Sequence, residues 1–296
     1  MSSDWGLMPE LAEVETVRKQ IAKRMKGHRI ETVVADESDR WLFEHVKVSE
    51  LRKALRGAKV KGAGRKGKYF WLELDRKPWP IFHLGMSGNV ALLDPKAKSA
   101  GHQKIWGGAK LWSERDSDLR DRLHFCHLLL ECDKGFEFAF IDPRRFGRVW
   151  LADDVWEHPR IKQLGFDPLL DFPTPKILGE KLAKRKKAIK AVLLDQSLFA
   201  GIGNWLADEI LFQAKLNPHT LASKLTPAQI RTLHKSTLSV VKKAVDVDAD
   251  YERFPRTWLF NERWGKSKAA KTSRGHKIVH EEIGGRTTAW VPQIQK

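Results

Sequence analysis

The chain has 296 residues, of which 42% are hydrophobic, and this supplies enough apolar material for the cores of about two globular domains. Lysine and arginine number 54 against 37 acidic residues, and the resulting net charge of +17 favours a polyanionic partner, most often nucleic acid. The two cysteines exclude a disulfide framework and a four-cysteine zinc site, and no apolar run approaches the roughly 18 residues of a membrane span.

The first predicted element is a helix over residues 10–26, where apolar residues recur at helical spacing up to Gly27. Pro9 stands directly before it and allows two interpretations. Proline favours the first position of a helix, so the residue can be purely structural. If the mature chain begins at Pro9, its secondary amine has a reference pKa of about 7.7–8.0, is partly neutral near pH 7, and can attack C1′ of a sugar to give an iminium.

From about residue 29 to 152 the pattern changes to short apolar runs broken by glycine, proline and charged pairs, which is typical of a β-sandwich or barrel. Residues 95–122 are rich in Lys, Ser, Gly and Asp and indicate a surface insertion. Cys126 lies next to histidines that could join it in a metal site. The alternation around 128–130 favours a strand there instead.

Prolines cluster where the β pattern stops, so residues 153–175 are interpreted as a linker. Helices are predicted after it at 176–197, 203–215 and 226–245, the last with Thr226 as its N-cap. The tail, 251–296, is β-like again.

A Gly-Ile-Gly-Asn turn joins the first two of these helices. Gly201 and Gly203 allow close backbone approach, and Asn204 with the amides that open the next helix can offer donors to an anion. Glycine pairs are common in turns, so this signal is weak when taken alone. The lysine-rich run at 181–190 fits either a solvated helix face or a phosphate-facing surface.

Six segments carry a resemblance to a known family. They are Met8-Pro9-Glu10-Leu11-Ala12-Glu13-Val14-Glu15-Thr16, Arg65-Lys66-Gly67-Lys68-Tyr69, His83-Leu84-Gly85-Met86-Ser87-Gly88, Asp142-Pro143-Arg144-Arg145-Phe146-Gly147, the Gly-Ile-Gly-Asn turn, and Gly284-Gly285-Arg286-Thr287-Thr288. Over nearly all of 8–296 the chain resembles the formamidopyrimidine-DNA glycosylase/endonuclease VIII family of base-excision repair enzymes.

The resemblance implies an α+β fold class with two DNA-binding parts. An N-terminal helix plus β-sandwich domain is expected over 8–152. A C-terminal helix-two-turn-helix domain is expected over 176–250, followed by a β-hairpin finger over 251–296, with DNA held in the cleft between the two parts.

The resemblance also assigns chemical roles. Pro9 corresponds to the nucleophile, Glu10 to the acid/base partner that protonates the opened sugar, Glu13 to a supporting acid, and Lys68 to a cation in a β-hairpin at the active site. The Schiff base acidifies C2′, so β-elimination and then δ-elimination can cut the strand on both sides of the sugar.

Further residues match the family's DNA contacts. One group enters the space left by the everted nucleotide, where an apolar wedge and a stacking ring offset the cost of unstacking and a guanidinium pairs with the orphaned base. A second group grips phosphates. The first comprises Met86, Arg144 and Phe146, and the second Arg145, Asn204 and Arg286.

The tail departs from members that have two Cys-x₂-Cys pairs, so no zinc and no cofactor is expected. The hairpin is expected to persist on apolar packing by Trp290, Val291, Ile294 and Ile278, as in the zincless-finger members, which include plant-type enzymes. The resemblance implies that residues 246–262 recognise the everted base, and for a member of the family this segment is short and differently composed. This favours formamidopyrimidines and other ring-opened or further oxidised purines over 8-oxoguanine.

The expected function is therefore a bifunctional DNA glycosylase/AP lyase that acts on damaged double-stranded DNA. We expect a monomer in the cytoplasm, at the bacterial nucleoid, or in a nucleus, with no membrane or metal partner and with salt-dependent DNA binding. The alternative is a catalytically silent or lyase-only relative that binds damaged or abasic DNA. It applies if residues 1–8 are retained, because Pro9 is then a tertiary amide.

Overall fold

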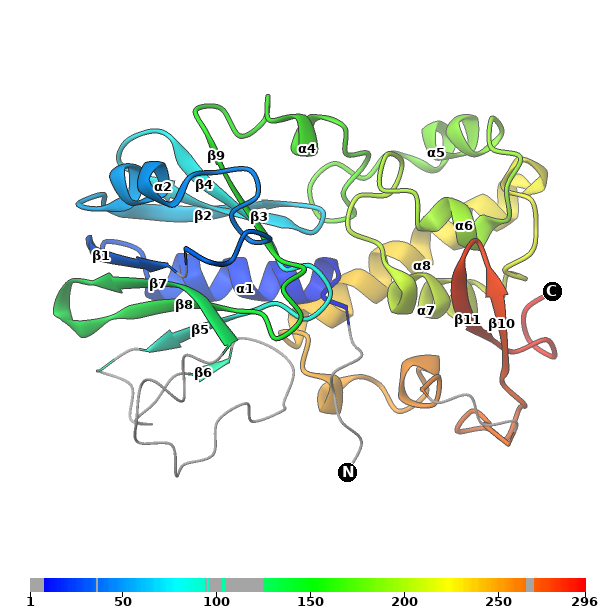
Figure 1. The fold of residues 1–296 in the computed structure, drawn as a ribbon. Helices are drawn as coiled ribbons and strands as arrows, with labels where there is room; N and C mark the ends of the chain where they lie inside the picture. Colours follow the sequence, from blue (N-terminus) through cyan, green and yellow to red (C-terminus); the bar gives the residue numbers. More distant parts are fainter. Residues whose placement is uncertain (1–7, 36, 94, 96–102, 105–124, 265–268) are drawn as a thin grey trace. The chain divides into compact units, whose positions relative to one another are not determined.

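The structure is a computed structural model that describes residues 8–35, 37–93, 95, 103–104, 125–264 and 269–296 (Figure 1). Residues 1–7 and most of the expected insertion at 95–122 lie outside the described residues. The chain divides into two compact units between Lys162 and Gln163. The finer domain ranges stay predictions.

The first unit is built from helix α1 (Leu11–Arg24) and two antiparallel sheets (Figure 1). One sheet has the strand order β1-β7-β8-β5-β6 and the other β2-β3-β4-β9. The strands are β1 (Ile30–Ala35), β2 (Val60–Lys66), β3 (Tyr69–Leu74), β4 (Trp79–His83), β5 (Asn89–Leu93), β6 (Gln103–Lys104), β7 (Cys126–Cys132), β8 (Glu137–Ile141) and β9 (Arg148–Ala152). The predicted helix-plus-sandwich fold is confirmed.

One hydrophobic cluster joins α1 to both sheets. Val14, Val17 and Ile21 lie on one stripe of the helix and are fully buried, because their spacing places them on a single face. The same cluster contains Phe82 of one sheet and Phe138 of the other, whose rings lie 5.7 Å apart. This packing fixes the start of α1 relative to the hairpins of the sandwich.

Two short helices lie in regions expected to be β or linker. Helix α2 (Val48–Leu55) buries Leu51, Ala54 and Leu55 at helical spacing, so the β interpretation of this stretch was wrong. Helix α4 (Pro159–Lys162) begins at one of the clustered prolines, a residue that favours the first turn of a helix.

The second unit contains α5 (Pro175–Leu182), α6 (Ile189–Leu193), α7 (Asn204–Ala214) and α8 (Pro227–Asp246). Thr226 caps α8 as predicted, in a capping box with Gln229. The prediction of a single helix over 176–197 was wrong, because α5 and α6 are separate helices. The backbone around Lys187 and Ala188 pairs with residues 221–222, and these hydrogen bonds replace helical ones between α5 and α6.

The tail forms a hairpin of β10 (Val279–Ile283) and β11 (Arg286–Trp290). The β-like interpretation of the tail was wrong at its beginning, because Leu259–Asn261 is a 3₁₀ helix. Ile278 and Val291 pack in a buried cluster under the hairpin, with Ile294 against it. Trp290 is half-buried and donates from Nε1 to the Glu281 carboxylate. Among the described helices, none is long and apolar enough to cross a membrane.

Candidate active site and DNA-binding surface

The N-terminus of α1 gathers a proline and two acids in a buried cluster. Pro9 is buried, and the side chains of Glu10 and Glu13 are 1% and 0% exposed. Glu10 is the N-cap, its carboxylate faces the amide of Glu13, and its own amide donates to Oε2 of Glu13 at 3.0 Å. The positive end of the helix dipole favours negative charge here. The arrangement therefore holds two carboxylates at the helix start that directly follows Pro9.

The turn that carries Lys68 is tied to the same helix. Arg65 on β2 is almost fully buried, and its Nε lies 2.8 Å from Oε2 of Glu15 on α1. Its Nη1 donates to the carbonyl oxygen of Gly67 at 3.0 Å. Lys68 is half-buried in the two-residue turn that follows. Sequence reasoning gave no role to Arg65 and Glu15, although both lie inside the quoted segments.

His83 is a further residue that sequence reasoning missed. It pairs with Tyr69 across β3 and β4, next to the Lys68 turn. Burial, together with the positive charges of Lys68, Arg148 and Arg160, lowers the pKa of His83 to about 3. Its Nδ1 accepts a hydrogen bond from the amide of Gly85 at 3.0 Å, so the neutral ring carries its proton on Nε2. His83 can thus donate a hydrogen bond without a charge.

One buried carboxylate holds the two turns that carry the predicted wedge residues. Asp142 accepts from Ser87 Oγ at 2.6 Å, from the Arg144 amide at 3.2 Å and from the Gly147 amide at 2.6 Å. A Cβ on Gly85 would come within 2.4 Å of the Phe146 backbone. Only glycine therefore lets the two turns approach so closely.

The structure brings Met86, Arg144 and Phe146 together. The Arg144 guanidinium lies 5.1 Å from the centre of the Phe146 ring, and its Nη2 is 3.9 Å from the Met86 sulfur. Phe146 is 45% exposed, which is unusual for a large aromatic side chain and frees its ring for stacking. Arg145 is also exposed, with a φ of 56° that turns the chain sharply.

We expect Phe146→Ala to weaken binding to a duplex with an abasic-site analogue by about 5- to 150-fold, because stacking of one base on an aromatic ring contributes about 1–3 kcal/mol. Thermal stability should hardly change, since the ring is half-exposed. Fluorescence anisotropy titration and thermal melting measure the two effects. Trp41→Ala removes another exposed ring of this unit and serves as the control. Equal losses for both variants would contradict a specific role for Phe146.

A buried pair, His127 and Asp39, contacts the backbone of the turn that contains Asp142. Nε2 of His127 donates to the Asp142 carbonyl oxygen at 3.0 Å, and its Nδ1 lies 2.8 Å from Oδ2 of Asp39. His127 and Asp39 are 4% and 0% exposed. His127, which lies beside Cys126, thus has structural partners on both ring nitrogens. Burial raises the pKa of the Cys126 thiol to about 12, which disfavours the thiolate that metal binding needs.

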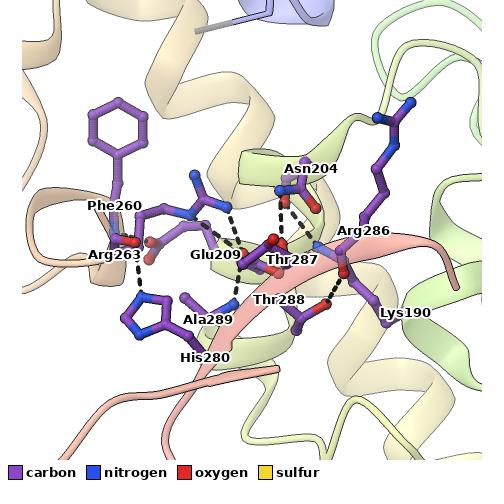
Figure 2. A network of polar contacts seen from close by, with 11 residues as sticks. Lys190, Asn204, Glu209, Phe260, Arg263, His280, Arg286, Thr287, Thr288 and Ala289 are labelled. Carbon is purple, nitrogen blue, oxygen red and sulfur yellow. Dashed lines mark hydrogen bonds and ion pairs between the residues drawn. The ribbon is translucent and has the colours of Figure 1, made fainter. Parts of the chain in front are cut away.

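In the second unit the hairpin brings Asn204 and Arg286 together. Gly203 is the N-cap of α7 and Asn204 is its first residue. Nδ2 of Asn204 donates to the carbonyl oxygen of Thr287 at 2.9 Å, so the neighbouring Arg286 lies beside the helix start (Figure 2). Arg286 is exposed. Of the run at 181–190, Lys190 is fully buried, which sequence reasoning missed, while the other four lysines are exposed.

Two family models match the chain in the order of its two units. The formamidopyrimidine-DNA glycosylase N-terminal domain matches residues 8–149, and the formamidopyrimidine-DNA glycosylase H2TH domain matches residues 164–255. The chain belongs to the formamidopyrimidine-DNA glycosylase family.

Curated formamidopyrimidine-DNA glycosylases are similar over most of the chain. The protein from Arabidopsis thaliana is 37% identical over 98% of this chain and 71% of its own length. The protein from Acidiphilium cryptum is 35% identical over 88% of both chains. The two cysteines of the chain cannot supply a four-cysteine zinc site, which is consistent with the zincless-finger type expected from the sequence. Among the described residues, no cluster of three or more His, Cys, Asp or Glu side chains is placed to bind a metal ion.

Solved structures of the Lactococcus lactis enzyme share the fold. One is non-covalently bound to DNA containing an AP site, with a TM-score of 0.76 and 30% identity over 97% of this chain and 99% of that one. Another is a complex with DNA containing N7-benzyl-Fapy-dG, with a TM-score of 0.76 and 29% identity over 97% of this chain and 100% of that one. The L. lactis enzyme was thus solved with DNA that contains an AP site and with DNA that contains N7-benzyl-Fapy-dG.

Proposed function

We propose that this formamidopyrimidine-DNA glycosylase family member excises oxidised bases from duplex DNA and cuts the strand at the resulting site, with Pro9 as its nucleophile. The observation that carries the proposal is the buried Pro9–Glu10–Glu13 cluster at the start of α1. The first unit also carries the Met86–Arg144–Phe146 group, in which Arg144 and Phe146 are exposed and Met86 is half-buried, and this group suits the filling of a void in the base stack.

The chemistry follows from these residue types. The Pro9 nitrogen forms a bond to C1′ as the bond from C1′ to the damaged base breaks, and Glu10 supplies a proton to the ring oxygen of the opening sugar. The iminium draws electrons from C2′, so loss of a C2′ proton expels the 3′ phosphate. A second elimination expels the 5′ phosphate. Water then releases the sugar fragment and restores the amine.

Ring-opened purines are the proposed substrates. The L. lactis relative was solved with DNA that contains Fapy-dG. The segment at 246–262 corresponds by resemblance to the one with which family members recognise the everted base. It is short for the family, and this favours ring-opened or further oxidised purines over 8-oxoguanine. The enzyme would work where genomic DNA lies, at a bacterial nucleoid or in a nucleus.

A panel of duplexes tests the proposal. The protein is incubated with duplexes that hold a formamidopyrimidine, 8-oxoguanine, an abasic site or no lesion, and the strands are separated without alkali. The expected result is cleavage at the formamidopyrimidine and at the abasic site, with phosphates left on both ends. Cleavage of the abasic site alone would indicate a lyase, and binding without cleavage a silent relative.

The silent relative is the second candidate, and one observation favours it. Seven residues precede Met8 in the sequence. With any residue attached, the Pro9 nitrogen is a tertiary amide that has no available lone pair. In that case the protein would bind damaged or abasic DNA through the Met86–Arg144–Phe146 group without reacting with it.

A further inference from the structure

The hairpin of β10 and β11 contacts α6 and α7 through polar and steric contacts at its tip and along β11. An isolated two-stranded hairpin is at best marginally stable in water, so its position depends on what it packs against. Three of these contacts are hydrogen bonds or close approaches to the helices. Each involves a residue of 284–289, the segment that carries Arg286.

The first contact is centred on Asp208 of α7, which is 1% exposed. Its Oδ2 accepts from the backbone amide of Ala289 on β11 at 3.1 Å. The same oxygen accepts from Arg263 at 2.6 Å from Nη2 and 3.2 Å from Nε, while Oδ1 pairs with the Nζ of Lys190 on α6. One carboxylate therefore joins two helices, a loop and a strand.

The charges make Asp208 hard to replace. Lys190 is 0% exposed and Arg263 is 8% exposed, so this carboxylate compensates the charges of two largely buried cations. Lys190 also donates to the carbonyl oxygen of Asn204 at 2.9 Å, which connects the cluster to the first residue of α7. The adjacent Glu209 accepts from the Phe260 amide at 2.8 Å and fixes the loop before Arg263.

The second and third contacts lie closer to the tip. Asn204 donates to the carbonyl oxygen of Thr287, as described above. Gly284 has a φ of +63° in the turn, and a Cβ at this position would lie 2.7 Å from the Cβ of Ala191 on α6. Gly285, with a φ of +74°, has no atom within 4 Å of such a Cβ. Of the two turn glycines, only Gly284 therefore packs closely against α6.

We propose that Asp208 and the Gly284–Ala191 contact are a positioning device that fixes β11 on α6 and α7, so that Arg286 and Asn204 are presented together to a DNA phosphate. The inference rests on the proposed function, because it takes these two residues as DNA contacts. Arg286 reaches the phosphate through a charge-assisted hydrogen bond, whose strength depends on distance and angle. A displaced β11 loses that contact although Arg286 itself is unchanged.

The Gly284/Gly285 pair gives the sharpest test. Gly284→Ala and Gly285→Ala add the same methyl group at residues with similar positive φ, so both suffer similar backbone strain, and only the first clashes with α6. Binding of the full-length protein to a duplex with a tetrahydrofuran abasic analogue is measured by anisotropy at several salt concentrations. Gly284→Ala should bind about tenfold or more weakly and lose about one phosphate contact from the salt slope. Gly285→Ala should stay within about threefold of the unchanged protein.

Asp208→Asn tests the buried cluster, with Glu180→Gln as the control that removes an exposed acid from α5 of the same unit. Asp208→Asn should weaken binding about tenfold or more, and the control should not. In a double-mutant cycle, Asp208→Asn should add little to Arg286→Ala, because the contact is already lost. Hydrogen exchange at the Ala289 amide should accelerate in Asp208→Asn.

Two results would overturn the inference while the unchanged protein still binds the duplex. One is an equal response of Gly284→Ala and Gly285→Ala, which remains informative if Asp208→Asn does not fold. The other is full additivity of Asp208→Asn with Arg286→Ala. Absence of binding by the unchanged protein would instead overturn the proposed function, and the inference with it.

Discussion

A protein whose chain begins at Pro9 is expected to form a covalent adduct with an abasic-site duplex when borohydride is added. Borohydride reduces the iminium between the Pro9 nitrogen and C1′, and the adduct is read as a band of lower mobility on a denaturing gel. A secondary amine gives an iminium that has no N–H to lose and so stays positively charged at any pH. That charge draws electrons from C2′ in the step that cuts the strand.

Two variants test the role of the terminus. Pro9→Gly should slow adduct formation about 10- to 100-fold, since a primary amine on a freer backbone is less well placed and a misplacement of about 1 Å costs up to 10²-fold. A protein that keeps Met8 should give no adduct, because its Pro9 nitrogen is an amide. Both should still bind the duplex. Full trapping with Met8 retained would show that another amine is the nucleophile.

Local patterns predicted much of the fold from the sequence. The spacing of Val14, Val17 and Ile21 predicted α1, and Thr226 with Pro227 predicted the start of α8, because these signals lie within one or two turns of the chain. The break between α5 and α6 was missed. It depends on pairing of residues 187–188 with residues 221–222, more than 30 positions away, and no local pattern encodes such a contact.

The same distinction applies to the candidate site. Pro9, Glu10, Lys68 and Arg286 were proposed from motifs, and they stay predictions. The residues that hold them in place were missed, since their partners are distant in sequence. Asp208 contacts Arg263 and Ala289 over 55 and 81 positions, and Arg65 contacts Glu15 over 50. For Lys190 the sequence did offer a signal, because this lysine stands between apolar residues of a predicted helix.

Glu10→Gln is expected to slow base excision from a formamidopyrimidine duplex by about 10²- to 10⁴-fold, the range typical of a general acid or base. Glutamine keeps the shape of the side chain but cannot supply a proton to the opening sugar. Single-turnover cleavage with excess protein measures the chemical step, and anisotropy measures binding separately. Since Glu10 is also the N-cap of α1, thermal melting should accompany both measurements.

The control for Glu10→Gln is Glu50→Gln, which removes an exposed acid from α2 of the same unit. It changes the net charge equally and should leave excision unchanged. If Glu10→Gln slows excision only as much as it weakens binding, the carboxylate acts through the helix start and not through proton transfer. If Glu13→Gln alone shows the full loss with binding intact, the proton comes from Glu13. In that case the hydrogen bond from the Glu10 amide would orient the acid that reacts.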